Sequence, residues 1–128
     1  MSGVFVDTNI LVYARDSSEP RKQEVAAAWM TRLWKSRRGR LSFQVLQEYY
    51  VTVTHKLDSR LDPLTARGEV RALMKWRPQA IDREVLEVAW RVQDSHRLSW
   101  WDALIVAAAE ASSCEFLLTE DLQDRQKI

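Results

Sequence analysis

The chain has 128 residues, of which 46% are hydrophobic, and this is enough for a single domain with its own apolar core. Its one cysteine, Cys114, excludes a disulfide framework and a cysteine-based zinc site, and is typical of a reducing cytosol. The 19 basic and 18 acidic residues leave a formal net charge of +1, so any nucleic-acid binding must come from a local patch rather than from bulk charge.

The first forty residues predict a short strand followed by helices. Residues 4–6 are an apolar run typical of a buried strand, and residues 9–14 should form a helical turn. Residues 22–37 carry apolar side chains at helical spacing, and Gly39 is expected to end this helix. Residues 41–42 are a candidate for a second short strand.

Residues 44–57 admit two interpretations. The stretch 50–54 is rich in β-branched side chains, as a strand would be. Over the whole segment, however, apolar side chains recur on one helical face for three turns, and this favours a helix. The side chains of that face are Leu46, Tyr49, Tyr50, Val53 and Leu57.

The second half of the chain continues this alternation of helices and short strands. The expected elements are a helix from Pro63 to about residue 75 capped by Asp62, a candidate strand at 78–81, a helix capped by Asp82, an alanine-rich helix capped by Ser99, and a strand at 115–118. Short strands separated by helices predict an α/β fold with a parallel sheet.

No secretory or membrane segment is expected. The N-terminus lacks a basic stretch followed by a long apolar one, and the longest apolar stretch, residues 103–109, is too short to span a bilayer. We therefore expect a soluble, cytoplasmic protein.

Four acidic residues interrupt or end segments that should be mostly buried. They are Asp7, Glu48, Asp102 and Asp121. Ionised carboxylates are rarely buried unless they are paired or hold a metal. Asp7 and Asp121 follow strands and Asp102 opens a helix, so all three belong at the edge where parallel sheets bind ligands. Clustered carboxylate oxygens are ligands that Mg²⁺ or Mn²⁺ prefers.

Each of these acids also has a purely structural interpretation. Asp7 and Asp102 can cap helices, the latter in a near capping box with Ser99, and Asp121 can be a turn residue. Glu48 can lie on a solvated edge of its helix. Individually these signals are weak, and the hypothesis of a cation site depends on their conjunction.

Two sets of basic residues are candidates for contact with a phosphate backbone. Arg15 follows Asp7 closely and could reach the crevice. The other set surrounds Gly39 and comprises Lys35, Arg37, Arg38 and Arg40. Both sets can equally be solvated surface residues.

Four segments together resemble the PIN-domain ribonucleases, and more closely the VapC-type toxins of bacterial and archaeal toxin–antitoxin pairs. These segments are residues 4–13 (VFVDTNILVY), 47–50 (QEYY), 99–105 (SWWDALI) and 118–124 (LTEDLQD). Their order and spacing cover nearly the whole chain, which is then one PIN-like nuclease domain over residues 1–128.

The resemblance implies a three-layer α/β/α sandwich around a mostly parallel sheet and a Mg²⁺- or Mn²⁺-dependent endoribonuclease. In that interpretation Asp7, Asp102 and Asp121 hold the metal, and Glu48 completes the acidic site and activates or positions the attacking water. Supporting positions are Asn9, Thr119 and Asp124. The resemblance also implies a cognate antitoxin that covers the crevice, and a homodimer.

One departure from the family pattern concerns the last strand. Family members usually continue beyond the segment of residue 121 with a glycine-containing turn and another apolar strand. Here Arg125 stands where a glycine is common, and the final edge strand is expected to be missing. Such a gap would leave an unpaired sheet edge.

Two other functions remain open from the sequence. One is a catalytically silent interaction module, but the intact set of four acidic residues argues against it. A nuclease that processes RNA or cleaves a DNA strand would keep the same chemistry in another role.

Overall fold

The structure is a computed structural model that describes residues 3–119 and 125–127. The strands are β1 (Gly3–Val6), β2 (Gly39–Arg40), β3 (Cys114–Leu118) and β4 (Arg125–Lys127). The helices are α1 (Thr8–Tyr13), α2 (Pro20–Ser36), α3 (Phe43–Val51), α4 (Pro63–Leu73), α5 (Arg83–His96) and α6 (Trp100–Ala111). A π-helical segment, Thr52–Lys56, continues α3, and a 3-10 turn, Met74–Trp76, continues α4.

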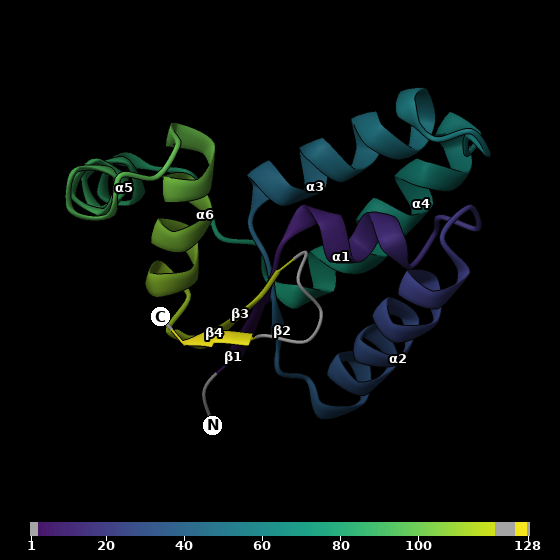
Figure 1. The fold of residues 1–128 in the computed structure, drawn as a ribbon, viewed down its shortest axis with the longest axis horizontal. Helices are drawn as coiled ribbons and strands as arrows, with labels where there is room; N and C mark the ends of the chain where they lie inside the picture. The colour runs from purple at the N-terminus through teal and green to yellow at the C-terminus, as the bar shows by residue number, and fades with distance from the viewer. Residues whose placement is uncertain (1–2, 120–124, 128) are drawn as a thin grey trace.

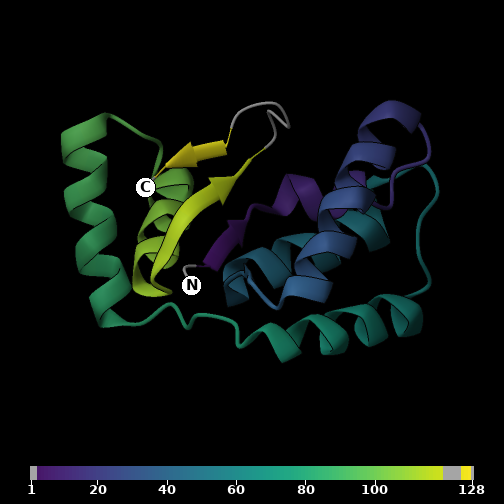
Figure 2. The same cartoon turned by 90° about the horizontal axis from the view of Figure 1, so that it is seen from below.

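The sheet has the strand order β2-β1-β3-β4. β1 lies parallel to both β2 and β3, with Val4 opposite Gly39 on one side and Val6 opposite Leu118 on the other. All four residues of β1 are buried, as expected for a central strand of a parallel sheet. Helices α1 to α4 lie on one side of the sheet, and α6 with α5 outside it on the other (Figures 1 and 2). The predicted α/β fold with a mostly parallel sheet is confirmed.

The expectation that the final edge strand is missing is wrong. β4 pairs antiparallel with β3, and Leu117 lies opposite Gln126. The strand has only three residues, and its sequence Arg-Gln-Lys lacks the apolar pattern from which a strand would be predicted. The free backbone groups along the edge of β3 provide hydrogen-bonding partners whatever the side chains are, so pairing can occur without that pattern.

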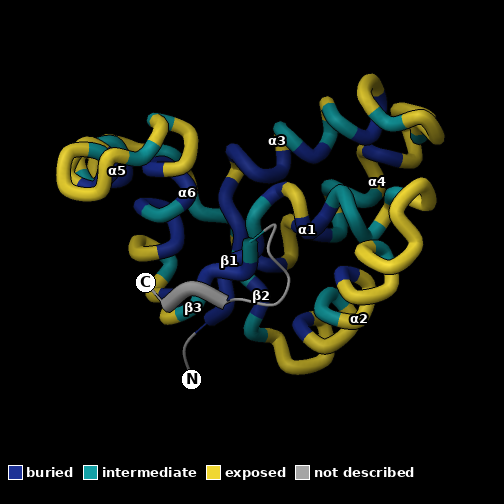
Figure 3. The backbone as a smooth tube through the Cα atoms, viewed as in Figure 1, coloured by how far each residue is buried: buried dark blue, intermediate teal, exposed yellow. Residues whose placement is uncertain are grey.

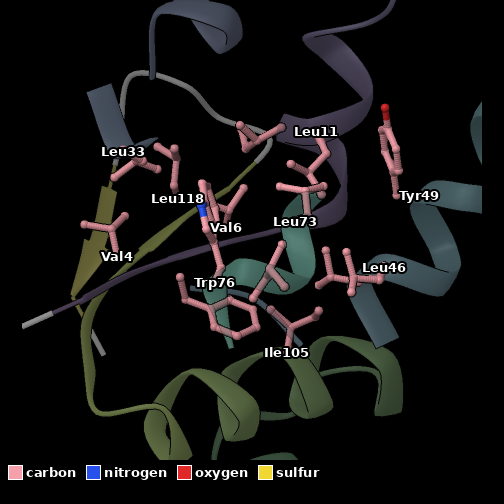
Figure 4. Packing of buried hydrophobic residues seen from close by; sticks show 14 of the residues in the cluster. Val4, Val6, Leu11, Leu33, Leu46, Tyr49, Leu73, Trp76, Ile105 and Leu118 are labelled. Atoms are coloured by element: carbon pink, nitrogen blue, oxygen red, sulfur yellow. The ribbon is translucent and has the colours of Figure 1, made fainter. Parts of the chain in front are cut away.

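Apolar side chains form two adjoining cores. The larger one joins the sheet to helices α1 to α4 and to α6, and it includes Phe5, Ile10 and Leu118, each with no exposed surface. Figure 4 shows Trp76 and Ile105 among the packed side chains of this cluster. The smaller core joins α5 to α6. Burial is therefore deepest around β1 and falls toward the outer faces of the helices (Figure 3).

The second strand begins earlier than predicted, because the turn after α2 does not use glycine. α2 ends at Ser36, and Arg37 adopts the left-handed conformation with φ of 59°. Gly39 is therefore not the helix cap. It starts β2, and the candidate strand at 41–42 contributes only an isolated bridge between Ser42 and Gln79.

The helical interpretation of residues 44–57 is confirmed and the strand interpretation is wrong. Leu46, Tyr49 and Val53 of the predicted face are buried. The β-branched residues Thr52, Val53 and Thr54 lie in the π-helical segment, where the Thr54 hydroxyl donates a 2.7 Å hydrogen bond to the carbonyl of Tyr50. π-helical turns within helices are rare and often occur at functional sites.

The remaining caps agree with the sequence predictions. The side chains of Asp62, Asp82 and Ser99 accept hydrogen bonds from the third residues of α4, α5 and α6. None of the helices in the described ranges combines the length and the apolar character needed for a membrane crossing.

Cys114 begins β3 beside Arg40 and is 7% exposed. Burial raises the pKa of its thiol from 9.0 to about 11, and the charge of Arg40 opposes this shift in part. At pH 8 the thiolate fraction is then lower by about 100-fold than in an open thiol. We expect slow reaction with a thiol reagent in the native protein and rapid reaction in denaturant. A native rate within a few-fold of the denatured rate would contradict this.

The raised pKa of Cys114 also makes the free energy of unfolding depend on pH. Because the native thiol keeps its proton to higher pH than the unfolded thiol, the contribution of Cys114 to the free energy of unfolding is complete below about pH 9. This contribution is lost as the pH rises through about 11.

Candidate functional site

Asp7 occupies the junction between the central strand and the first helix. Its backbone N–H donates to the carbonyl of Leu118 at 3.0 Å, which ties the end of β1 to the end of β3. Its carboxylate Oδ1 accepts a 2.6 Å hydrogen bond from the N–H of Thr8 and caps α1. The capping interpretation is therefore correct, and the same cap holds the carboxylate at the sheet edge where ligands bind.

Glu48 is held beside this junction by a hydrogen bond. The hydroxyl of Thr8 donates to Glu48 Oε1 at 2.8 Å, joining two residues that are forty positions apart. Thr8 is buried and Glu48 is half-buried in the middle of α3. This hydrogen bond holds the half-buried carboxylate of Glu48 beside the β1–α1 junction, which a fully solvated helix edge would not do.

Asp102 lies in the first turn of α6, across from the N-terminal part of α3 (Figure 1). The Ser99 hydroxyl accepts a 3.2 Å hydrogen bond from the N–H of Asp102 and is the N-cap of the helix. The carboxylate of Asp102 is exposed and contributes to the same cleft as Asp7 and Glu48. The positive end of the α6 dipole favours a negative charge at this place.

These three acidic residues line one open cleft of about 720 Å³. It is lined by Asp7, Thr8, Asn9, Gln44, Gln47, Glu48, Val51, Thr52, Lys56, Ile81, Trp101, Asp102, Leu104 and Ile105. The acidic side chains come from the β1–α1 junction, α3 and α6, so tertiary packing brings together what the sequence separates. In the described ranges, no three acidic, histidine or cysteine side chains are close enough to form a metal site by themselves.

The structure describes two of the four remaining predicted site residues, Asn9 and Thr119. Asp121 and Asp124 lie outside the described residues. Asn9 is exposed in the cleft, whereas Thr119 is half-buried directly after β3 and is not among the lining residues. Because Leu118 is bonded to Asp7, the chain at Thr119 leaves β3 beside the Asp7 junction.

The proposed phosphate contacts of the basic residues are not supported by their positions. Arg15 forms an ion pair with Glu69, and Glu69 also accepts a 2.5 Å hydrogen bond from the hydroxyl of Tyr49. Arg15 is not among the residues that line the cleft. The residues around Gly39 precede or begin β2, whose first residue lies opposite Val4. They therefore sit toward the edge of the sheet opposite Asp7.

Two cleft residues escaped prediction from the sequence. Lys56 is the one basic residue among the cleft-lining residues that the structure describes. It lies eight positions after Glu48 at the end of the π-helical segment. This spacing, about two helical turns, was the only feature of the sequence that could have indicated that Lys56 shares a cleft with Glu48. Gln44, one helical turn before Glu48, is 7% exposed, and within the described part of the chain neither its amide nitrogen nor its amide oxygen has a partner.

The unpartnered amide of Gln44 predicts an unusual response to mutation. A buried polar group without a hydrogen bond destabilises a fold by about 1–3 kcal/mol. We expect Gln44→Leu, which keeps the size and removes the amide, to leave the melting temperature of the metal-free protein unchanged or to raise it. A fall of several degrees would show that Gln44 has partners in the native protein. Gln47→Leu, at an exposed glutamine of the same cleft, is the control.

The oxygen donors of the cleft are of the chemical kind that a divalent cation takes. Carboxylate oxygens are suitable donors, and Mg²⁺ usually takes only one or two of them directly and keeps several waters. The amide of Gln44 supplies a buried donor and acceptor that such waters would satisfy. Asp7 and Asp102 are the described residues that would hold the ion, with Asp121 as a further candidate.

A second hollow, between α3 and α4, has a different character. Its volume is about 450 Å³, and the described residues that line it include Phe43, Leu46, Arg67 and Arg71 but no carboxylate. The cleft of Asp7 is therefore better suited than this groove to metal-dependent chemistry.

Comparisons with known proteins place the fold and the family of this chain. The structure of VapC20 from Mycobacterium tuberculosis, described as a sarcin-ricin loop cleaving toxin, is similar to this chain with a TM-score of 0.67. The two are 20% identical over 93% of this chain and 90% of that one. The comparison with curated proteins finds no match. The PIN domain family model matches residues 4–126, and the chain therefore belongs to the PIN domain family.

Proposed function

We propose that this protein is a Mg²⁺- or Mn²⁺-dependent endoribonuclease that acts as the toxin of a type II toxin–antitoxin pair. The observation that carries the proposal is the meeting of Asp7, Glu48 and Asp102 in one cleft of a PIN domain. Structural likeness to a VapC toxin supports the same role. Residues 1–128 would then form one nuclease domain.

Asp7, Asp102 and Asp121 are proposed as the metal-holding residues, with Asn9, Thr119 and Asp124 in support. The chemistry that a divalent cation supplies when bound is a lower pKa for water and neutralisation of phosphate charge. Asp7 is positioned for this by its bond to Thr8 and by the link of its backbone to Leu118.

Glu48 is proposed to orient and deprotonate the attacking water. The Thr8 hydroxyl occupies one of its carboxylate oxygens, which leaves the other free to accept the proton. The water oxygen forms a bond to phosphorus as the bond from phosphorus to the 3′ oxygen breaks. The products are a 5′-phosphate and a 3′-hydroxyl that takes a proton from solvent. Lys56 in the same cleft is suited to contact a phosphate.

The partners proposed are an RNA substrate, a cognate antitoxin and a second copy of the chain. A basic side chain of the antitoxin would find three carboxylates in the cleft, and this is the charge complementarity that an inhibitor needs. Sedimentation of the purified chain measures its oligomeric state. Co-expression with a small basic protein encoded nearby tests whether that protein is the antitoxin.

The test of the proposed function is cleavage of total cellular RNA with Mg²⁺ or Mn²⁺, followed by mapping of the new ends. Cleavage that stops in EDTA and leaves 5′-phosphates supports the proposal. Cleavage that persists in EDTA contradicts the metal mechanism. A silent interaction module would give neither cleavage nor a Mn²⁺-dependent thermal shift, and preferential cleavage of single-stranded DNA would favour the other nuclease role.

A further inference from the structure

Trp101 has a position that differs from that of the five other tryptophans. It is 61% exposed and lines the cleft, directly before Asp102. Four of the others pair with another ring: Trp34 lies against Trp76 at 5.1 Å, and Trp90 stacks on Trp100 at 6.1 Å. Trp29 lies beneath the guanidinium of Arg32 at 4.9 Å. Among the residues that the structure describes, the ring of Trp101 has neither kind of contact.

The helix explains why adjacent tryptophans differ. Successive residues of an α-helix point about 100° apart, so Trp100 and Trp101 face different neighbours. Trp100 packs toward α5, where Trp90 lies. Trp101 lies one turn before Ile105, and both side chains line the cleft. Its open ring therefore belongs to the cleft wall next to a carboxylate, and not to the contact between α5 and α6.

An exposed aromatic ring at this place could stack on a base if the cleft binds a polynucleotide. Aromatic side chains bind unpaired bases by stacking, which requires no particular base because each one has a π-face. A phosphodiester placed at Asp7 and Asp102 would bring a neighbouring base close to the residue adjacent to Asp102. Isolated exposed tryptophans are common on protein surfaces, and here the position beside the three acids gives the ring its significance.

We propose that Trp101 is a substrate-binding residue that stacks on a base next to the scissile phosphate of single-stranded RNA. This rests on the proposed function, because the stacked base belongs to the strand held by the acidic cleft. The contact selects unpaired over paired RNA, since a base within a helix offers no free face. It adds affinity without reading the base sequence.

The experiment measures binding rather than cleavage. The parent protein is Glu48→Gln, which keeps Asp7 and Asp102 and is expected to hold RNA without cutting it, and the probe is fluorescent octaadenylate with Mg²⁺. Trp101→Ala is expected to weaken binding by about 5- to 100-fold, and Trp101→Phe, which keeps an aromatic face, by much less. Trp34→Ala removes a 40% exposed tryptophan outside the cleft and is expected to bind as the parent does. Thermal melts of each variant establish that it is folded.

A second probe separates stacking from other contacts. An octamer of abasic ribose phosphates keeps the backbone and has no bases. The parent should prefer octaadenylate over the abasic octamer, and Trp101→Ala should lose most of that preference. Equal loss of affinity for both probes would overturn the inference, and so would Trp101→Leu binding as tightly as Trp101→Phe.

Two further outcomes also count against Trp101 as a stacking residue. One is unchanged RNA binding by Trp101→Ala together with an altered oligomeric state, which would assign the ring to an interface between copies. The other is no binding of octaadenylate by the parent. Either result leaves the proposed nuclease function standing if the wild-type protein still cleaves RNA with metal.

Discussion

Asp7→Asn and Asp102→Asn are each expected to reduce metal-dependent RNA cleavage by about 10²- to 10⁴-fold. The change removes one negative charge from the cleft and leaves the size of the side chain unchanged. Loss of a few kcal/mol of transition-state stabilisation corresponds to this range. Initial rates on a defined RNA with Mn²⁺ measure the effect, and the Mn²⁺-dependent rise in melting temperature should disappear in both variants.

The fold should survive these substitutions. Asparagine is as good an N-cap as aspartate, so the amide oxygen in Asp7→Asn can keep the bond to Thr8 that starts α1. Asp102 is exposed, and its own cap comes from Ser99. Melting temperatures without metal should therefore stay within a few degrees of the wild type.

Asp62→Asn is the matched control for both variants. Asp62 caps α4 by accepting from the N–H of Thr65 at 3.2 Å and does not line the cleft. The same chemical change there should leave the cleavage rate and the Mn²⁺ shift intact. Wild-type rates in Asp7→Asn or Asp102→Asn would remove the basis for assigning metal binding to the cleft.

The second prediction concerns two glycines with opposite expected effects on stability. A Cβ on Gly39 would lie 2.5 Å from the ring of Trp76, which is itself buried and covered by Trp34. The ring has little room to move, so Gly39→Ala should destabilise the fold by about 1–3 kcal/mol. A Cβ on Gly68, in the interior of α4, would meet no atom of the described residues within 4 Å. Gly68→Ala should therefore stabilise by about 0.5–1 kcal/mol.

Denaturant titrations of the two alanine variants measure these free energies of unfolding. The pair is informative because the added atoms are identical and only the surroundings differ. A neutral Gly39→Ala would mean that Trp76 can retreat, and the core beside β2 would then be less tightly packed than the structure indicates. A destabilising Gly68→Ala would place an unrecognised contact on the outer face of α4.

The candidate site could be predicted in part from local sequence. Each acid stands where an apolar segment starts, ends or is interrupted, and that conflict with burial is visible without coordinates. The structure brings Asp7, Glu48 and Asp102 to one cleft, while their roles stay predictions. Gln44 and Lys56 carried no such conflict, because one looks like an ordinary helical polar residue and the other like a solvated helix end.

The basic residues show the limit of reasoning from proximity along the chain. Arg15 lies eight positions after Asp7, yet α1 carries it away from the cleft to Glu69 on α4. Arg15 was placed near the acids only because it follows Asp7 closely in the sequence. A helix of six residues is enough to reverse that expectation.

The sequence alone determined the α/β class, the helices and the N-caps Asp62, Asp82 and Ser99, because periodicity and capping depend on residues within a few positions of one another. Only the tertiary structure decided where β2 starts, that β4 closes the sheet edge, and which polar side chains share the cleft. Those features depend on backbone pairing and on contacts between distant segments. Arg37 adopts a left-handed turn and Thr8 reaches Glu48 because the packed core holds their neighbours in place.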